Sequence, residues 1–180
     1  MDLAGAIPSA GSPGIAFPLP DEASAKGLGD VAKMSADITL DKLGDQLSGD
    51  DRQTFTTAMG SVTPWLLAQP DRFALLHGDY RLDEMLFDRD KSRVGVVDWQ
   101  TLGLGLPARD LAYFTATSLK SGLRSAIDED PVDDYYRTLS GYGVTPKDCE
   151  TCWRDYWLGV PQALLIAALG FAFRHGHRAG

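Results

Sequence analysis

Apolar residues first recur with a clear period after Ser48. Four of them are three or four positions apart, which places them on one face of a helix: Phe55, Met59, Val62 and Leu66. Ser48 is followed three residues later by the acidic Asp51, an arrangement typical of a helix N-cap. Pro64 predicts a kink or a restart inside this stretch. The pattern therefore predicts a helical segment that begins after Ser48 and is interrupted near Pro64.

Shorter apolar runs follow and predict strands. Residues 73–76 form one such run, and residues 85–87 and 93–97 flank the polar turn "DRDKS", as in a hairpin. Beyond this hairpin the period becomes helical again, and three helices are predicted: 109–119, 131–139 and 146–175, the last interrupted near Pro161. Helices around a small hairpin define an α+β fold that is mostly helical.

The N-terminal part shows neither a helical nor a strand period. Residues 1–35 are rich in Gly, Pro, Ala and Ser, which predicts an irregular segment. We place the boundary so that residues 1–44 are irregular or poorly ordered and residues 45–180 form one domain. The stretch "GLGDVAK", 27–33, contains a lone Gly-x-Gly without a flanking hairpin, which is a weak signal for a phosphate-binding loop.

Composition narrows the classes of partner. The chain has 180 residues and a net charge of −8 without a basic tract, which argues against a nucleic-acid partner. Its two cysteines do not suggest a secreted disulfide scaffold, and "CETC" lacks the second pair that a zinc site needs. The N-terminus does not resemble a signal peptide, and the apolar run 158–173 is shorter than the roughly 20 residues of a spanning helix. We expect a cytoplasmic protein without a membrane partner.

Two aspartates on either side of the predicted hairpin are candidates for chemistry. Asp79 and Asp98 each follow an apolar run. Two carboxylates brought together can divide phosphoryl transfer, one accepting the proton of the substrate hydroxyl and the other binding magnesium on nucleotide phosphates. Arg81 could offset charge on the transferring group. Either aspartate alone is more typical of a turn or a strand end, but the pair, with His77 and Gly78 before Asp79, favours function.

Three motifs in order carry a family resemblance: "HGDYRLDEMLF", "VGVVDWQ" and "GLPARDLAYF". They resemble the catalytic half of the aminoglycoside phosphotransferase and choline kinase-like superfamily. Gln100 after Asp-Trp is similar to the branch called ecdysteroid kinase-like, or CHK kinase-like. The resemblance covers roughly residues 45–175. It implies the C-terminal lobe of a protein-kinase-like fold, which uses ATP and magnesium to phosphorylate a hydroxyl on a small molecule.

The resemblance also implies roles for single residues. It makes Asp79 the catalytic base, with Arg81 beside it, and Asp98 the principal magnesium ligand. His77 would brace the catalytic loop. Asp110 resembles the buried aspartate that fixes this loop from the start of a helix, although a plain N-terminal helix charge explains it nearly as well.

Glu84 departs from the family pattern. The family has an asparagine five residues after the catalytic aspartate, at the second magnesium site, and Glu84 occupies that position here. A glutamate can ligate magnesium, so Glu84 remains a candidate metal and cofactor ligand. It is one methylene longer than asparagine and adds a negative charge near a polyphosphate. We therefore expect impaired rather than adapted chemistry.

A nucleotide-binding lobe is expected to be missing from this chain. The family holds ATP beneath an N-terminal sheet, and the residues before His77 show no train of alternating strands. A partner chain could supply that lobe. The alternative from another class is a non-catalytic, pseudokinase-like remnant that acts as a binding or interaction module. A metal-dependent phosphohydrolase using His77 and Asp79 is a third reading, which no further His/Asp cluster in the sequence supports.

Overall fold

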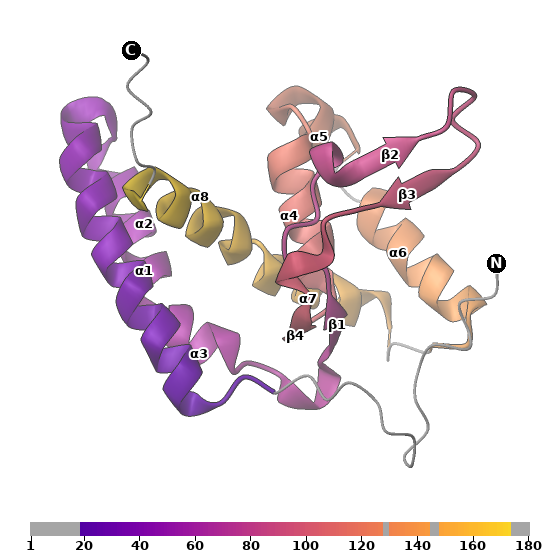
Figure 1. Cartoon of the computed structure of the whole chain (residues 1–180), viewed down its shortest axis with the longest axis horizontal. Coiled ribbons are helices and arrows are strands. Elements are labelled where there is room, and N and C mark those ends of the chain that lie inside the picture. Colours follow the sequence, from indigo (N-terminus) through magenta and orange to yellow (C-terminus); the bar gives the residue numbers. More distant parts are fainter. Residues whose placement is uncertain (1–18, 128–129, 145–147, 174–180) are drawn as a thin grey trace.

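The computed structural model describes residues 19–127, 130–144 and 148–173 (Figure 1). The helices are α1 (Glu22–Leu43), α2 (Gly49–Gly60), α3 (Val62–Leu66), α4 (Ala108–Ser118), α5 (Ser121–Ile127), α6 (Asp130–Gly141), α7 (Cys149–Gly159) and α8 (Pro161–Phe173). The strands are β1 (Ala74–Leu76), β2 (Met85–Phe87), β3 (Val94–Val96) and β4 (Gly103–Gly105). The chain is therefore a mostly helical α+β protein, as its sequence predicts.

Helix α1 corrects one expectation. Residues 22–43 form a helix of 22 residues where the composition predicted an irregular segment. Asp21 caps its start, because its side chain accepts a hydrogen bond from the Ser24 backbone at 2.7 Å. The small residues that hid the helical pattern form its buried face, including Ala25, Ala32 and Ala36. Residues 1–18 of the expected irregular segment lie outside the described residues.

Gly29 shows what the "GLGDVAK" stretch does. This glycine is buried in α1, where an added Cβ would overlap Thr63 Oγ1 on α3. Thr63 also donates a hydrogen bond to the Ala25 carbonyl at 3.3 Å. The glycine therefore lets two helices pack closely, and the stretch is not a phosphate-binding loop, in agreement with the prediction.

The helical segment after Ser48 is confirmed. Ser48 Oγ accepts a hydrogen bond from the Asp51 backbone at 3.1 Å and caps α2. Helix α2 ends at Gly60 and α3 begins at Val62, with Pro64 in the first turn of α3. The proline thus lies where a new helix starts, which is the position at which it costs little.

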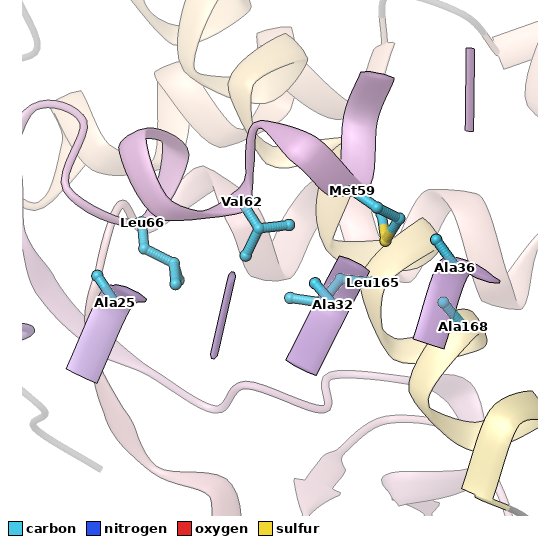
Figure 2. Close-up of a cluster of buried hydrophobic side chains, with 8 residues drawn as sticks. All are labelled: Ala25, Ala32, Ala36, Met59, Val62, Leu66, Leu165 and Ala168. Atoms are coloured by element: carbon cyan, nitrogen blue, oxygen red, sulfur yellow. The ribbon is translucent and has the colours of Figure 1, made fainter. Parts of the chain in front are cut away.

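One core lies among α1, α2, α3 and α8, the helices at the left of Figure 1. Figure 2 shows its buried side chains: Ala25, Ala32, Ala36, Met59, Val62, Leu66, Leu165 and Ala168. The alanines of α1 are small enough for the neighbouring helices to approach closely, and Met59 and Val62 fill the remaining space. Helix α8 therefore completes a core that begins at the other end of the described chain.

Helices α4, α6 and α7 form the second part of the molecule. Helix α7 lies against α4, where an added Cβ at Gly159 would stand 2.8 Å from the Ala108 carbonyl oxygen. Asp155 of α7 is 6% exposed, and its Oδ1 accepts a hydrogen bond from Arg72 Nη1 at 2.7 Å. This ion pair joins α7 to the chain segment that leads into β1. Cys149 and Cys152, at the start of α7, are free thiols.

Within the described ranges, the α7–α8 run is one stretch, Cys149–Phe173, that is long and apolar enough to cross a membrane by length and composition. A buried core helix passes the same test, so a single such run is weak evidence for a span. Leu165 and Ala168 of α8 are buried in the core against α1. The sequence predicted a buried core helix for residues 158–173, and the structure buries only part of this stretch, since 28% of the most apolar window within Cys149–Phe173 is buried.

The strands form two antiparallel pairs. Strand β2 pairs with β3, with Met85 opposite Val96, so the predicted hairpin is confirmed. Strand β1 pairs with β4, with Leu76 opposite Gly103, a pairing that the sequence did not reveal. Because β1 and β4 lie side by side, the residues after Leu76 adjoin the residues before Gly103. This pairing positions the candidate site. No strand precedes Ala74 within residues 19–73.

Candidate active site

Residues 77–84, here named the Asp79 loop, are held by hydrogen bonds to Asp110. The Asp110 carboxylate accepts hydrogen bonds from the backbone N–H groups of His77, at 2.6 Å, and Gly78, at 3.0 Å. Asp110 lies in the first turn of α4. Burial raises the pKa of this carboxyl, while the two N–H donors oppose the rise. Asp110 therefore ties the start of α4 to the backbone of the loop.

His77 joins the Asp79 loop to the segment after β3. The side chain is 3% exposed, and Nε2 is 2.8 Å from the Val97 carbonyl oxygen. Because a carbonyl only accepts, Nε2 carries the proton and donates. The Trp99 ring lies 4.7 Å from the imidazole, and Thr101 Oγ1 donates to the His77 carbonyl at 2.6 Å. His77 therefore connects the Asp79 loop to the segment around Val97 and Thr101.

Gly78 has a backbone that few other residues adopt. Its φ is +84°, and an added Cβ would stand 2.6 Å from the Thr101 carbonyl oxygen. Gln162 of α8 donates a hydrogen bond to the Gly78 carbonyl at 2.7 Å. Gln162 in turn accepts from Arg109 Nε at 3.1 Å. Burial lowers the pKa of Arg109 to about 10. Arg109 and Gln162 thus link α8 to the loop, a role that the sequence did not indicate.

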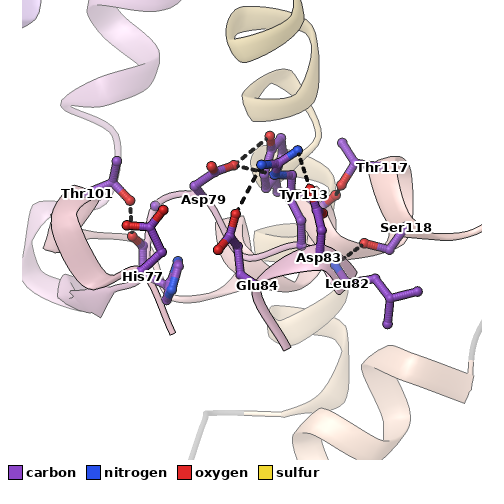
Figure 3. Close-up of polar contacts among 12 residues, drawn as sticks. His77, Asp79, Leu82, Asp83, Glu84, Thr101, Tyr113, Thr117 and Ser118 are labelled. Atoms are coloured by element: carbon purple, nitrogen blue, oxygen red, sulfur yellow. Dashed lines mark hydrogen bonds and ion pairs between the residues drawn. The ribbon is translucent and has the colours of Figure 1, made fainter. Parts of the chain in front are cut away.

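Asp79 projects from this loop toward α4 (Figure 3). Tyr113 Oη donates a hydrogen bond to Asp79 Oδ1 at 2.9 Å. The tyrosine is 3% exposed and lies one helical turn after Asp110, so one face of α4 holds both the backbone and the side chain of the loop. Sequence reasoning missed Tyr113, although its spacing of three residues from Asp110 was a usable signal.

Arg81 bridges three carboxylates. Its Nε lies 2.9 Å from Asp79 Oδ1, its Nη1 3.0 Å from Asp83 Oδ2 and its Nη2 3.2 Å from Glu84 Oε1. The Asp79 contact is an ion pair whose N–H is not well directed at the oxygen. The Glu84 side chain is only 14% exposed, so its charge has Arg81 as a close partner in a partly desolvated position. Glu84 is therefore held toward Arg81.

Asp98 follows β3 and comes directly after Val97, whose carbonyl oxygen is the partner of His77. Its φ of +59° and ψ of 55° lie in the left-handed region, where a non-glycine residue is strained. The carboxylate is exposed to solvent, and Gln100 Nε2 donates to its Oδ2 at 3.3 Å. The ring of Trp99, the next residue, lies against His77 with its plane tilted by 58°. The structure thus brings the segments of Asp79 and Asp98 together around His77.

The donor set fits magnesium only in part. Among residues 19–127, 130–144 and 148–173, no group of three His, Cys, Asp or Glu side chains could hold a metal ion by itself. Magnesium is commonly held by one or two carboxylates, with phosphate and water oxygens completing its shell. Asp98, with its exposed side chain, is the candidate for such a ligand. Glu84, by contrast, is already ion-paired with Arg81.

A cleft of about 400 Å³ lies beside Arg81, and we name it the α8 cleft. Its lining residues are Arg81, Asp83, Tyr113, Thr117, Ala163, Ile166, Ala167, Gly170 and Phe171. Arg81 and Tyr113 both contact Asp79, which is not itself a lining residue, so the cleft is connected to that carboxylate through two of its lining side chains. A slightly larger groove, about 450 Å³, lies between α1, α2 and α8 and includes no residue of the Asp79 loop. Of these two hollows, only the smaller one includes a residue of the Asp79 loop.

Comparison with known proteins identifies the class. Residues 16–147 match the phosphotransferase enzyme family (APH), and the chain belongs to this family. This confirms the resemblance drawn from the three motifs.

The chain is also similar to parts of two curated proteins. Mouse acyl-CoA dehydrogenase family member 10 is 34% identical over 108 residues, which cover 51% of this chain and 10% of that protein. Chicken acyl-CoA dehydrogenase family member 11 is 40% identical over 63 residues, which cover 32% of this chain and 8% of that protein. The matched part is thus a tenth or less of these relatives. No solved structure matches the chain.

Proposed function

We propose that this chain is the kinase-like C-terminal lobe of an ATP-dependent phosphotransferase that acts on a hydroxyl of a small molecule in the cytoplasm. The observation that carries the proposal is Asp79, which contacts two residues lining the α8 cleft, Tyr113 and Arg81, from a loop held by Asp110 and His77. Membership of the phosphotransferase enzyme family supports it. The relatives' names say nothing further about the acceptor of this chain.

The residues divide the reaction as follows. The Asp79 carboxylate accepts the proton of the substrate hydroxyl while that oxygen bonds to the γ-phosphorus and the bond to the ADP oxygen breaks. Tyr113 orients the carboxylate through its hydrogen bond. Asp98 is the residue that would hold magnesium, which when bound supplies positive charge to the nucleotide phosphates. Asp110 keeps the loop backbone in place.

Arg81 must give up some of its present ion pairs in order to contact the transferring phosphoryl group. In the structure it is ion-paired with Asp79, Asp83 and Glu84, so it partly neutralises the charge of the proposed base, Asp79. An incoming phosphoryl group is a stronger partner for a guanidinium than a solvated carboxylate, and it would draw Arg81 toward the transferring group. Glu84 opposes that movement because it holds Nη2. We therefore propose a phosphotransferase whose activity is impaired by Glu84.

The non-catalytic alternative also has a specific observation in its favour. Asp79 is held by Arg81, and no strand that could cover a nucleotide precedes Ala74 within residues 19–73. The hairpin carries exposed apolar side chains, with Leu86 62% and Val94 54% exposed. Such a surface is typical of a face that another protein covers. In this alternative the hairpin is the surface through which the lobe binds a partner protein.

Calorimetric titration of magnesium–ATP tests the proposal, both on this chain and on a version joined to a family nucleotide lobe. We expect binding in the joined version and its loss in Asp98→Asn. The matched control is Asp88→Asn, which removes an equal charge from the hairpin turn. Asp79→Asn should preserve binding and slow transfer by about 10²–10⁴-fold. If the joined version binds no magnesium–ATP, or if Asp98→Asn and Asp88→Asn behave alike, the phosphotransferase proposal fails.

A further inference from the structure

The two walls of the α8 cleft differ in chemistry. Helix α8 supplies one wall through Ala163, Ile166, Ala167, Gly170 and Phe171, which carry no polar side-chain group. Its sequence, PQALLIAALGFAF, contains no charged residue. The opposite wall comes from the Asp79 loop and α4 and holds the charged and hydroxyl groups. A ligand in this cleft therefore meets polar groups at one side and hydrocarbon at the other.

The charged and hydroxyl groups of the polar wall already have partners within the protein. Arg81 ion-pairs with Asp83 at 3.0 Å and with Asp79 at 2.9 Å. Thr117 Oγ1 already donates to the Tyr113 carbonyl at 2.7 Å. A polycationic acceptor would place further ammonium groups against α8. The α8 wall of the cleft has no carboxylate to pair with them. Leaving a charge against an apolar wall is costly, whereas an alkyl chain gains from the same contact.

We infer that the acceptor is an amphipathic alcohol, with its hydroxyl beside Asp79 and an uncharged aliphatic segment along α8. This inference rests on the proposed function for the placement of the hydroxyl. A cleft of about 400 Å³ is within the range of pockets that hold small molecules. The acceptor is thus distinguished from an aminoglycoside by its uncharged far end.

Methyl NMR of the full chain tests the inference at a single residue. With isoleucine labelled in its δ1 methyl group, Ile166 reports on the cleft, and Ile127, at the end of α5, is an internal control that does not line it. We expect 1,2-decanediol to shift the Ile166 signal in a saturable way and to leave Ile127 in place. We expect kanamycin, a polycationic aminoglycoside, to shift Ile166 little at the same concentration.

A matched pair of glycine variants tests whether the diol binds in the α8 cleft. Gly170 lies in the cleft wall, and an added Cβ there meets nothing within 4 Å, so Gly170→Leu fills space without a backbone clash. Gly122 in α5 is equally open and lies outside the cleft. Gly170→Leu should weaken decanediol binding at least tenfold, and Gly122→Leu should leave it unchanged. Thermal unfolding of both variants establishes that they are folded.

Three outcomes would overturn the inference: no Ile166 shift with decanediol, a larger shift with kanamycin, or equal diol affinity in Gly170→Leu and the wild type. The first two need no variant, so a folding defect in Gly170→Leu cannot hide the result. Diol binding is measured without nucleotide. If the diol binds but magnesium–ATP never does, the amphipathic cleft stands and phosphotransfer fails. If magnesium–ATP binds and kanamycin is preferred to the diol, phosphotransfer stands and the amphipathic cleft fails.

Discussion

Tyr113 donates a hydrogen bond to Asp79 over 2.9 Å from a position that is 3% exposed. Burial, and then the hydrogen bond and negative charge of Asp79, raise the pKa of Tyr113 above its ordinary value of 10.0. The unfolded chain releases this proton near pH 10 and the folded chain retains it. The stabilising contribution is therefore complete below pH 10 and is lost as pH rises above it.

Asp79→Asn should lower the pKa of Tyr113, because the neighbouring negative charge disappears while burial remains. Tyr135 is the internal control, since burial raises its pKa to about 12 and Asp79 is not among the causes. Alkaline titration followed by tyrosinate absorbance measures both, with Tyr113→Phe and Tyr135→Phe used for assignment. An unchanged Tyr113 titration in Asp79→Asn would contradict the contact.

Asp110→Asn should loosen the Asp79 loop. The amide can present only one oxygen to two backbone N–H donors and turns its own N–H₂ toward the other. We expect a loss of about 2–3 kcal/mol in the free energy of unfolding, measured with urea. Asp21→Asn is the control, because asparagine caps a helix about as well as aspartate, and it should cost less than about 0.5 kcal/mol. Equal losses in the two variants would show that the two hydrogen bonds accepted by Asp110 do not stabilise the Asp79 loop.

Gly78→Ala should be more destabilising than its backbone conformation alone requires. Gly78 and Gly143 both have positive φ, +84° and +75°, but only Gly78 would place a Cβ against the Thr101 carbonyl, at 2.6 Å. Alanine at Gly143 should cost about 1 kcal/mol for the left-handed backbone. Gly78→Ala should cost at least about 1 kcal/mol more, and it should also speed amide exchange at His77. Similar unfolding free energies would show that Thr101 gives way freely.

Arg72→Met should leave Asp155 buried without its cation. We expect a loss of about 3 kcal/mol at neutral pH, because an unpaired buried carboxylate is costly. The double variant Arg72→Met/Asp155→Leu should recover most of it. Burial raises the pKa of Asp155 even in the wild type, so the single variant should regain stability as pH falls and the carboxyl becomes neutral. A loss that is independent of pH would point to packing of the arginine stem instead.

Glu84→Asn should release Arg81 and improve the affinity of the joined version for magnesium–ATP. Two unit charges about 4 Å apart interact by about 4 kcal/mol at an effective dielectric of 20, before compensation by ions and water. A surviving effect of about 1.4 kcal/mol would already be tenfold in binding. Asp83→Asn is the control, because it also removes a partner of Arg81 but lies at the exposed side. If both variants bind nucleotide like the parent, Glu84 is a tolerated residue.

Part of the fold was predictable because apolar and polar positions recur with a helical or a strand period. The helix after Ser48, the 85–97 hairpin and helices α4 and α6 follow such a period. Helix α8 was predicted from its continuous apolar run, and α5 was not predicted. Helix α1 was missed because its buried face consists largely of alanine, glycine and serine, whose hydrophobic contrast is small. Strand β4 was missed because a Gly-Leu-Gly strand has no alternation, and only its pairing with β1 defines it.

The site divides in the same way. Asp79, Arg81, Glu84, Asp98 and Asp110 were found because their motifs are local in sequence. Tyr113 and Gln162 were not, since their partners are 34 and 84 residues away and the contacts exist only after helices pack. Local motifs thus indicated the candidate carboxylates, and tertiary packing supplied the groups that contact them.

The contact between α1 and α8 has a consequence for how this chain folds during synthesis. Leu165 and Ala168 complete a core whose other members lie between Ala25 and Leu66, and Lys42 Nζ donates to the Ala172 carbonyl across 130 residues. The first three helices therefore leave the ribosome with an apolar face that stays uncovered until α8 has emerged. Contacts so distant in sequence slow folding and lengthen the time in which that face is open to aggregation or to a chaperone.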